Sequence, residues 1–307
     1  MVTLRELQVE ELYGPGHRMC AGCGGAITAR MTLKALKRPT VAVNATGCLE
    51  VATTIYPYTA WRIPWVHGLF ENAAAIASGI ETYLRSSNDN KLDTDIVVFA
   101  GDGGTFDIGL QSLSGAFERR HDFTYVCYDN EAYMNTGIQR SSATPEGAWT
   151  TTTPIGPASP GKIGPKKDLI AFGLAHHIDY AATASPAYWS DFITKIQKAA
   201  AVDGPALIHV ISPCPLGWRF PTDQTIRMAS LAVQTRYFPL YEVEKGKYKL
   251  SMNPHNVPVD DFLKMQGRFN HLFRPENADE LAALKSQIEQ RWVALQELCQ
   301  GKHPTWS

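Results

Sequence analysis

The sequence predicts an α/β protein in which a mostly parallel sheet carries helices on both faces. An apolar run at residues 96–100 ends in a glycine turn at residues 101–104, and a second apolar run follows at residues 123–129. Between them, residues 108–120 carry apolar side chains at helical spacing. Such a strand–helix–strand unit places its two strands parallel. Residues 206–211 (Ala-Leu-Ile-His-Val-Ile) are typical of a further strand that is buried on both faces.

The other elements continue this alternation along the chain. We expect a helix at residues 26–36 and a strand at 40–45 before the central unit, and a long loop rich in proline and glycine at 144–165 after it. Beyond the loop we expect, in order, a helix at 168–176, a strand at 180–184, a helix at 189–201, the strand at 206–211, a helix at 225–236, a β-hairpin at 241–250 and a final helix with an apolar stripe from Leu281 to Leu298.

Composition limits the classes of partner. The chain of 307 residues has a net charge of −1, which offers no field that attracts nucleic acid or anionic lipid. No apolar run approaches the length of about 20 residues that spans a membrane, and the first residues lack the apolar stretch of a signal peptide. We therefore expect a cytoplasmic protein without nucleic-acid or membrane partners. The basic cluster of Lys162, Lys166 and Lys167 is expected to be solvated or to contact a partner.

Oxygen-bearing side chains follow both strands of the central unit. Asp102 comes directly after the first strand, and Asn130 follows the second. Because the carboxyl ends of parallel strands meet at one edge of a sheet, where open α/β sheets bind ligands, we expect the two side chains to lie close together. Carboxylate, amide and carbonyl oxygens suit Mg²⁺ that also binds a phosphate, which glycines allow backbone N–H groups to approach. An ordinary turn in which Asp102 caps a helix is the alternative.

Four of the six cysteines lie in predicted turns. Cys20 and Cys23 form a C-x-x-C, a spacing that lets two thiolates face one metal. Cys48 and Cys214 each follow a predicted strand, so a parallel sheet can gather all four at one edge. Four thiolates suit either a 4Fe-4S cluster or structural zinc, and buried thiols without metal are the third alternative.

Taken together, these motifs resemble those of a known family. The glycine turn and the asparagine that follows it resemble the thiamine diphosphate-binding motif. The chain is most similar to the β subunit of the 2-oxoacid:ferredoxin oxidoreductases, in particular the pyruvate synthase branch, and the oxalate oxidoreductase β subunit is a close relative. The resemblance covers roughly residues 10–250 and is carried by residues 17–24, 46–50, 64–74, 101–109 and 128–145. One departure is Gly25, where single-chain relatives carry Glu.

The resemblance implies three cofactors: thiamine diphosphate, Mg²⁺ and one 4Fe-4S cluster. The implied cluster ligands are Cys20, Cys23, Cys48 and Cys214, and the implied Mg²⁺ ligands are Asp102, Asn130 and the carbonyl of Ala132. The residues implied to bind the cofactor are Gly47, Cys48, Gly101, Asp102, Gly103, Gly104, Asn130 and Ala132. Asn135 is implied to reach the substrate as the catalytic residue, and a turn residue that braces its own backbone is the alternative. Thr105 and Asp107 either line the diphosphate or cap a helix.

The resemblance also implies a domain plan and partners. Residues 1–222 would form the diphosphate-binding half of a thiamine diphosphate fold with the cluster loops, and residues 223–307 an extension that packs on it or on partner subunits. An α subunit would supply the pyrimidine-binding domain and its activating Glu, and γ and δ subunits would carry ferredoxin-type clusters, whose tandem cysteine runs this chain lacks. We therefore expect the isolated chain to be inactive.

The implied reaction is oxidative decarboxylation of pyruvate with coenzyme A, with electrons passed to ferredoxin. The stretch Asn135-Thr136-Gly137 resembles the pyruvate-type loop. Three alternatives stay open: another 2-oxoacid, including oxalate, which needs no coenzyme A; a non-redox thiamine diphosphate enzyme with structural zinc; and an assembly subunit that has lost its cofactor.

Overall fold

The computed structural model describes residues 3–7, 9–156, 159–254 and 257–302. Within this part of the chain, eight strands form one sheet in the order β10-β9-β7-β8-β4-β3-β1-β2. The strands from β7 to β2 in this order are parallel to one another, whereas β9 is antiparallel to β7 and β10 to β9. The bounds are β1 Thr40–Ala45, β2 Trp65–Gly68, β3 Asp95–Gly101, β4 Thr124–Asp129, β7 Tyr180–Ala184, β8 Ala206–Ile211, β9 Tyr241–Glu244 and β10 Lys247–Leu250. The predicted parallel sheet and terminal hairpin are thus confirmed.

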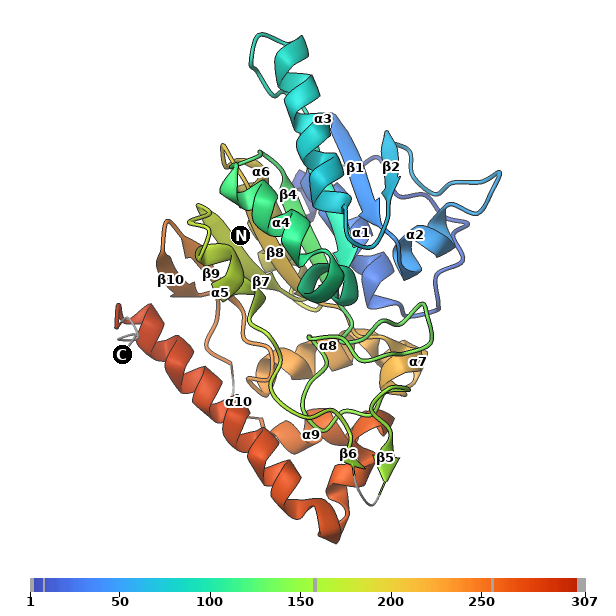
Figure 1. The fold of residues 1–307 in the computed structure, drawn as a ribbon, viewed down its shortest axis with the longest axis vertical. Coiled ribbons are helices and arrows are strands. Elements are labelled where there is room, and N and C mark those ends of the chain that lie inside the picture. The colour runs from blue at the N-terminus through green and yellow to red at the C-terminus, as the bar shows by residue number, and fades with distance from the viewer. Residues whose placement is uncertain (1–2, 8, 157–158, 255–256, 303–307) are drawn as a thin grey trace.

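Helices cover both faces of this sheet (Figure 1). Their bounds are α1 Gly24–Ala35, α2 Cys48–Thr53, α3 Ala73–Ser87, α4 Leu110–Glu118, α5 Leu169–Leu174, α6 Trp189–Ala200, α7 Pro215–Trp218, α8 Thr225–Gln234, α9 Val259–Lys264 and α10 Ala278–Cys299. Short 3-10 turns occupy Leu4–Glu6, Thr222–Gln224, Gly267–Phe273 and Pro275–Asn277, a π-helical turn occupies Gly103–Ile108, and β5 (Ile155–Gly156) pairs with β6 (Ser159–Pro160).

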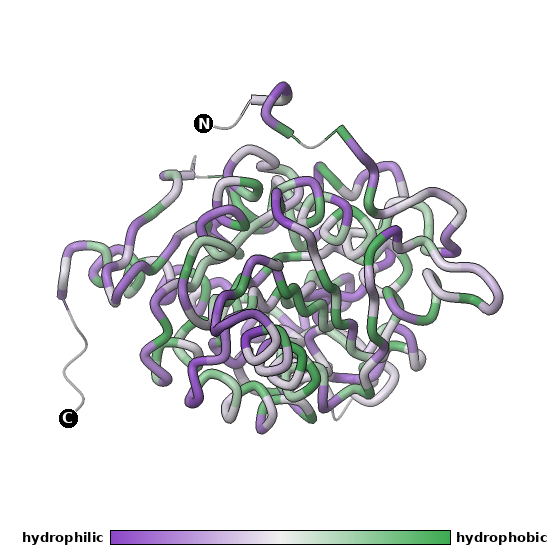
Figure 2. The backbone as a smooth tube through the Cα atoms, turned by 90° about the horizontal axis from the view of Figure 1, so that it is seen from above, coloured by the Kyte–Doolittle hydropathy of each residue, from purple (hydrophilic) through white to green (hydrophobic). Residues whose placement is uncertain are grey.

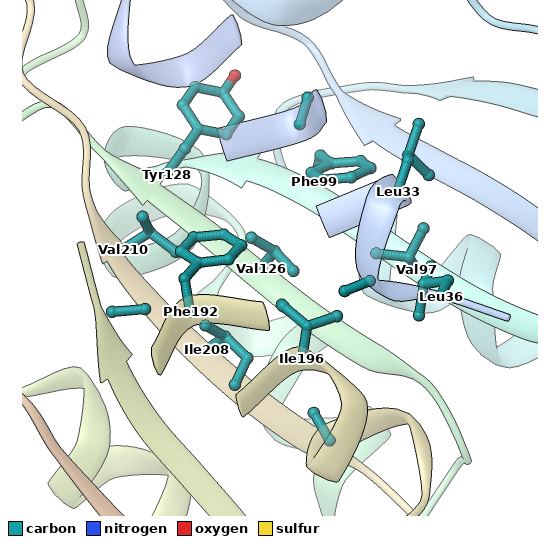
Figure 3. Packing of buried hydrophobic residues seen from close by; sticks show 14 of the residues in the cluster. Leu33, Leu36, Val97, Phe99, Val126, Tyr128, Phe192, Ile196, Ile208 and Val210 are labelled. Atoms are coloured by element: carbon teal, nitrogen blue, oxygen red, sulfur yellow. The ribbon is translucent and has the colours of Figure 1, made fainter. Parts of the chain in front are cut away.

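Alternation along the central strands produces two apolar layers. In β3, Val97 and Phe99 pack with α1 and α6, whereas Ile96 and Val98 pack with α3, α4 and α5 on the opposite face. Figure 3 shows Phe192 of α6 lying against strand residues of the first layer. Figure 2 shows hydrophobic strand segments crossing the middle of the molecule. Burial of both faces explains why the central strands are nearly continuous apolar runs.

The C-terminal part extends the fold in two ways. β9 and β10 add to the sheet, and α8, α9 and α10 lie together below it in Figure 1. These helices form a third apolar cluster with Ile211 and Trp218. The division at residue 222 stays a proposal. No helix within the described ranges is long and apolar enough to cross a membrane.

We expect Phe192→Ala to lower the free energy of unfolding by about 3–5 kcal/mol, because its fully buried ring leaves a cavity between α6 and the sheet. Urea unfolding followed by circular dichroism measures the change. Tyr83→Ala removes an aromatic side chain that is 68% exposed and is the matched control, expected within about 0.5 kcal/mol of the unsubstituted chain. Equal losses in the two variants would contradict the assigned core.

Candidate functional site

The predicted cofactor residues meet in one pocket at the carboxyl ends of β1, β3 and β4. We call it the edge pocket; all eight residues predicted to bind the cofactor line it, and so does Asn135. The other lining residues are Thr46, Phe70, Tyr128, Tyr133, Met134 and Thr136. Its cavity volume is about 30 Å³. Asn135 and Thr136 are exposed on its rim, so a ligand larger than water needs a second surface above them.

Three oxygen-bearing groups converge in the edge pocket. One terminal atom of the Asn130 amide group lies 3.0 Å from Asp102 Oδ1 and 2.8 Å from the Ala132 carbonyl oxygen. If this atom is the amide nitrogen, it donates a hydrogen bond to each of the two oxygens. If it is the amide oxygen, three oxygen atoms surround one point without a proton between them. The second arrangement suits a divalent cation with oxygen ligands. The residues present therefore fit Mg²⁺.

The Asp102 carboxylate is fully buried and receives few hydrogen bonds. Ser141 Oγ donates to its Oδ2 at 2.5 Å, and the backbone N–H of Asn130 donates to its Oδ1 at 3.3 Å. Burial, and then the nearby Asp129 carboxylate, raise the pKa of Asp102 well above its ordinary value. A bound cation reverses this preference because it favours the ionised form.

The turn that carries Asn130 and Ala132 depends on the residue between them. Glu131 has a left-handed backbone conformation with φ 66°, which is uncommon for a residue other than glycine, and its side chain is fully buried. Arg268 Nη2 lies 2.5 Å from Glu131 Oε2, and Lys166 Nζ lies 3.0 Å from Oε1. Tyr237 donates a hydrogen bond to Oε1 at 2.7 Å. Buried charges therefore hold this turn in place.

The same network extends to Asp129 at the end of β4. Lys166 Nζ lies 2.5 Å from Asp129 Oδ2, and His209 Nε2 lies 2.7 Å from the same oxygen. Although burial alone would raise it, Lys166 and His209 hold the pKa of Asp129 down at about 2. The prediction that Lys162 and Lys166 are solvated or contact a partner was wrong. Lys162 is buried and donates to the carbonyls of Gly164 and Pro165, and the Lys166 side chain is only 8% exposed and pairs with Asp129.

The glycine turn has no room for side chains. A Cβ at Gly103 would lie 2.3 Å from Tyr133 Cε1, and one at Gly104 would lie 3.0 Å from the Phe70 carbonyl oxygen. Thr105 and Asp107 were expected to line the diphosphate or to cap a helix, and their polar atoms bond elsewhere. Thr105 Oγ1 donates to the Gly101 carbonyl at 2.7 Å, and Asp107 accepts from the backbone N–H of Ser142 at 3.0 Å. The first bond lies within the glycine turn, and the second joins this turn to the loop that follows Asn135.

The four predicted ligand cysteines come together beside the edge pocket. The backbone N–H of Gly24 donates to the Pro213 carbonyl at 3.1 Å, which joins the Cys23 loop to the Cys214 loop. Burial, and then the thiols of Cys214, Cys23 and Cys20, raise the pKa of Cys48 to about 12, and Asp102 adds to this shift. All four cysteines are free thiols, with Cys20 the most exposed.

This set of four thiols has the composition of a cluster ligand set. Within the described part of the chain, no three His, Cys, Asp or Glu side chains form a group that could hold a metal ion as they stand. Four thiolates are the usual ligands of a 4Fe-4S cluster and also of structural zinc. The buried hydroxyls of Tyr13 and Tyr128 beside these thiols have no hydrogen-bond partner in the described chain, as expected where a sulfur acceptor belongs. The cysteines therefore fit a 4Fe-4S cluster.

Another polar group lies at the rim of the edge pocket. His67 Nε2 lies 2.9 Å from Thr46 Oγ1, and His67 Nδ1 lies 3.7 Å from Glu50 Oε1. A larger cleft of about 670 Å³ lies at the amino ends of the strands, away from the motifs. Its two arginines, Arg38 and Arg85, are already paired with carboxylates. The convergent chemistry is therefore at the carboxyl edge.

Comparison with known proteins identifies the family. Residues 45–210 match the family model described as thiamine pyrophosphate enzyme, C-terminal TPP binding domain. The chain is 53% identical over 270 residues to pyruvate synthase subunit PorB of Methanothermobacter thermautotrophicus. The aligned region covers 88% of this chain and 93% of that protein. This chain belongs to the β subunits of the 2-oxoacid:ferredoxin oxidoreductases. It is therefore an oxidoreductase subunit with a thiamine pyrophosphate-binding domain.

Other members of the family and the fold agree with this assignment. The chain is 46% identical over 300 residues to ketoisovalerate oxidoreductase subunit VorB of Pyrococcus abyssi, with 96% of this chain and 95% of that protein covered. A solved 2-oxoglutarate:ferredoxin oxidoreductase from Magnetococcus marinus has the same fold, with a TM-score of 0.56 and 20% identity over 73% of this chain and 81% of that chain. The predicted family and fold class are confirmed, whereas the roles of individual residues stay predictions.

Sequence reasoning missed the buried charges around Glu131. Arg268 lies 137 positions beyond Glu131 in the sequence. Arginine and glutamate usually lie at the solvent-exposed surface, so neither residue indicated a buried ion pair. One signal was available, because Glu131 directly follows an apolar run and separates two predicted ligands.

We expect Arg268→Met to destabilise this β subunit by about 3–5 kcal/mol, because it leaves the Glu131 carboxylate buried with one charged partner fewer. Arg30→Met is the matched control: Arg30 pairs with Glu11 at the surface and is 60% exposed, so its loss is expected to cost at most about 1 kcal/mol. Urea unfolding of both variants measures the difference. A cost for Arg268→Met no larger than the control would show that the pair does not hold the turn.

Proposed function

We propose that this chain binds the diphosphate of thiamine diphosphate through Mg²⁺ and holds one 4Fe-4S cluster beside it. The enzyme would oxidise pyruvate with coenzyme A to acetyl-coenzyme A and carbon dioxide and pass the electrons through the cluster to ferredoxin. One observation supports this most strongly: the oxygen triad and the thiol of Cys48 lie at one edge of the sheet, where Cys48, Asp102, Asn130 and Ala132 line the same pocket.

The residues of the edge pocket have distinct tasks in this proposal. Asp102, Asn130 and the Ala132 carbonyl would hold Mg²⁺, and the backbone of Gly103 and Gly104 would lie against the diphosphate. When bound, thiamine diphosphate supplies the carbon nucleophile and the electron sink for decarboxylation. The buried charges around Glu131 keep two of the three oxygens in place, which limits reorganisation during turnover.

Asn135 is the proposed contact to the substrate. It lies exposed on the rim of the edge pocket, beyond the oxygen triad, and Thr136 beside it bonds to Gln139 within the same turn. An amide in this position can donate to a 2-oxoacid oxygen. The exposed rim supports the proposal that another chain covers the site.

Partner subunits would therefore complete the site. We propose an α subunit that supplies the pyrimidine-binding domain and an activating Glu, and γ and δ subunits with ferredoxin-type clusters. The small volume of the edge pocket and the exposure of Asn135 and Thr136 support a second surface. Six free thiols support a reducing, cytoplasmic location.

The substrate is proposed from the relatives. The identity to a pyruvate synthase subunit, 53%, exceeds the 46% to a ketoisovalerate oxidoreductase subunit, which favours pyruvate. Ketoisovalerate is the second candidate, because that relative covers nearly the whole chain.

Anaerobic reduction of a low-potential dye by the whole complex tests the reaction. Pyruvate, ketoisovalerate, 2-oxoglutarate and oxalate are compared in parallel, each with and without coenzyme A. We expect pyruvate to give the highest rate and the rate to require coenzyme A. Turnover of oxalate without coenzyme A would overturn the substrate assignment, and no turnover with any 2-oxoacid would favour a non-redox or assembly role.

We expect Asp102→Asn to weaken thiamine diphosphate binding in the presence of Mg²⁺ by about 10–100-fold or more, because it removes the only charged oxygen of the triad. Isothermal titration of the apo complex with the cofactor measures this. Asp93→Asn neutralises an exposed carboxylate before β3 and is the matched control, expected to bind normally. Unchanged affinity in Asp102→Asn would exclude the proposed metal site.

A further inference from the structure

Tyr128 lies near the end of β4, between the cysteine loops and the glycine turn. It is 2% exposed, and its hydroxyl has no hydrogen-bond partner in the described part of the chain. The nearby Leu49 amide can only donate, so it offers no acceptor for the hydroxyl proton. Because buried polar groups are almost always paired, this unpaired hydroxyl indicates an acceptor that belongs beside it.

Glycines from three separate segments lie around the Tyr128 ring, and the one at position 47 leaves no room for a side chain. A Cβ at Gly25 would lie 3.4 Å from Tyr128 Cδ2, and one at Gly101 would lie 3.5 Å from Cε2. A Cβ at Gly47 would lie only 2.9 Å from the hydroxyl oxygen, which is closer than carbon–oxygen contacts allow. The ring thus lies among the start of α1, the end of β3 and the turn before Cys48, and its hydroxyl lies at that turn.

The surroundings of the hydroxyl favour sulfur as the acceptor. Cys48 lines the edge pocket with Tyr128, and the position of a Cβ at Gly25 lies 3.6 Å from Cys23 Sγ and 3.4 Å from the Tyr128 ring. Figure 3 shows the hydroxyl pointing away from the aliphatic side chains of Val126 and Val210. The ring itself belongs to the first apolar layer.

We infer that the Tyr128 hydroxyl donates a hydrogen bond to the 4Fe-4S cluster at its Cys48 corner and thereby raises the reduction potential of that cluster. The inference rests on the proposed function. Tyrosine keeps its proton at neutral pH, since its ordinary pKa is about 10. A donor to cluster sulfur stabilises the reduced form more, because that form carries one more negative charge. Tyr128 would thus help the cluster accept electrons from the neighbouring thiamine site.

An electron paramagnetic resonance-monitored redox titration of the anaerobic complex tests this. The signal of this cluster is the one that Cys214→Ala abolishes. We expect Tyr128→Phe to shift its midpoint to a more negative potential, with the ratio of reduced to oxidised cluster at a fixed potential about tenfold lower, equivalent to about 59 mV for one electron. An unchanged midpoint with the cluster in place would overturn the inference.

Tyr180→Phe is the matched control. Tyr180 is also buried in the first apolar layer, on β7, and donates to Glu242 Oε2 at 2.9 Å, with carboxylates rather than thiols as its titratable neighbours. Its removal is expected to leave the midpoint unchanged. A shift of equal size in Tyr180→Phe would show that loss of any buried hydroxyl has this effect, which would overturn the inference.

Two further measurements separate the remaining explanations. Thiamine diphosphate affinity is measured in Tyr128→Phe: a loss of affinity without a change in midpoint assigns the hydroxyl to that cofactor and overturns the inference.

If the variant does not assemble, electron–nuclear double resonance of the unsubstituted reduced cluster decides, since an exchangeable proton coupled to this cluster is expected and its absence overturns the inference. Zinc instead of iron in the unsubstituted complex would refute the proposed function itself.

Discussion

One constraint organises this β subunit: four neighbouring parallel strands, β1, β3, β4 and β8, end at the same edge of the sheet. Whatever residues follow those strands are brought together, however far apart they are in the sequence. Cys48, Asp102, Asn130 and Cys214 each occupy such a position. Strand order therefore brings Cys48 and Cys214 to the oxygen triad, whereas the loop of Cys20 and Cys23, which follows no strand, is joined to the Cys214 loop by the hydrogen bond from Gly24 to Pro213.

The sheet alone does not fix the orientation of the oxygen triad. Glu131 has a left-handed backbone conformation between two of the donors, and its buried charge is balanced by Lys166 and by Arg268 from the C-terminal part. Lys166 also neutralises Asp129. Lys166 thus offsets part of the effect by which the Asp129 carboxylate opposes the ionisation of Asp102. The C-terminal part thus contributes to the chemistry of the edge although it supplies none of the predicted ligands.

Much of the candidate site could be predicted because its residues follow apolar runs. Two features of the sequence predict where Asp102, Asn130 and Cys48 lie. Each follows an apolar run typical of a strand, and parallel strands end at one edge of a sheet. Lys162 and Lys166 could not be placed in this way, since a short basic cluster has the same appearance whether its charges are solvated or paired inside the molecule. The role of Arg268 could not be predicted either, because its partner Glu131 lies far away in the sequence. Local pattern also does not indicate what covers the rim of the edge pocket at Asn135, which is exposed.

The account depends most on the claim that Cys20, Cys23, Cys48 and Cys214 bind an iron–sulfur cluster beside the oxygen triad. This claim is tested directly by measuring iron, acid-labile sulfide and zinc in two anaerobically purified complexes, the unsubstituted complex and the Cys48→Ala variant. The account predicts that the substitution removes about four iron atoms and four sulfides per copy of this chain and that neither complex contains stoichiometric zinc. Unchanged iron and sulfide, or one zinc per chain lost in place of iron, would contradict it.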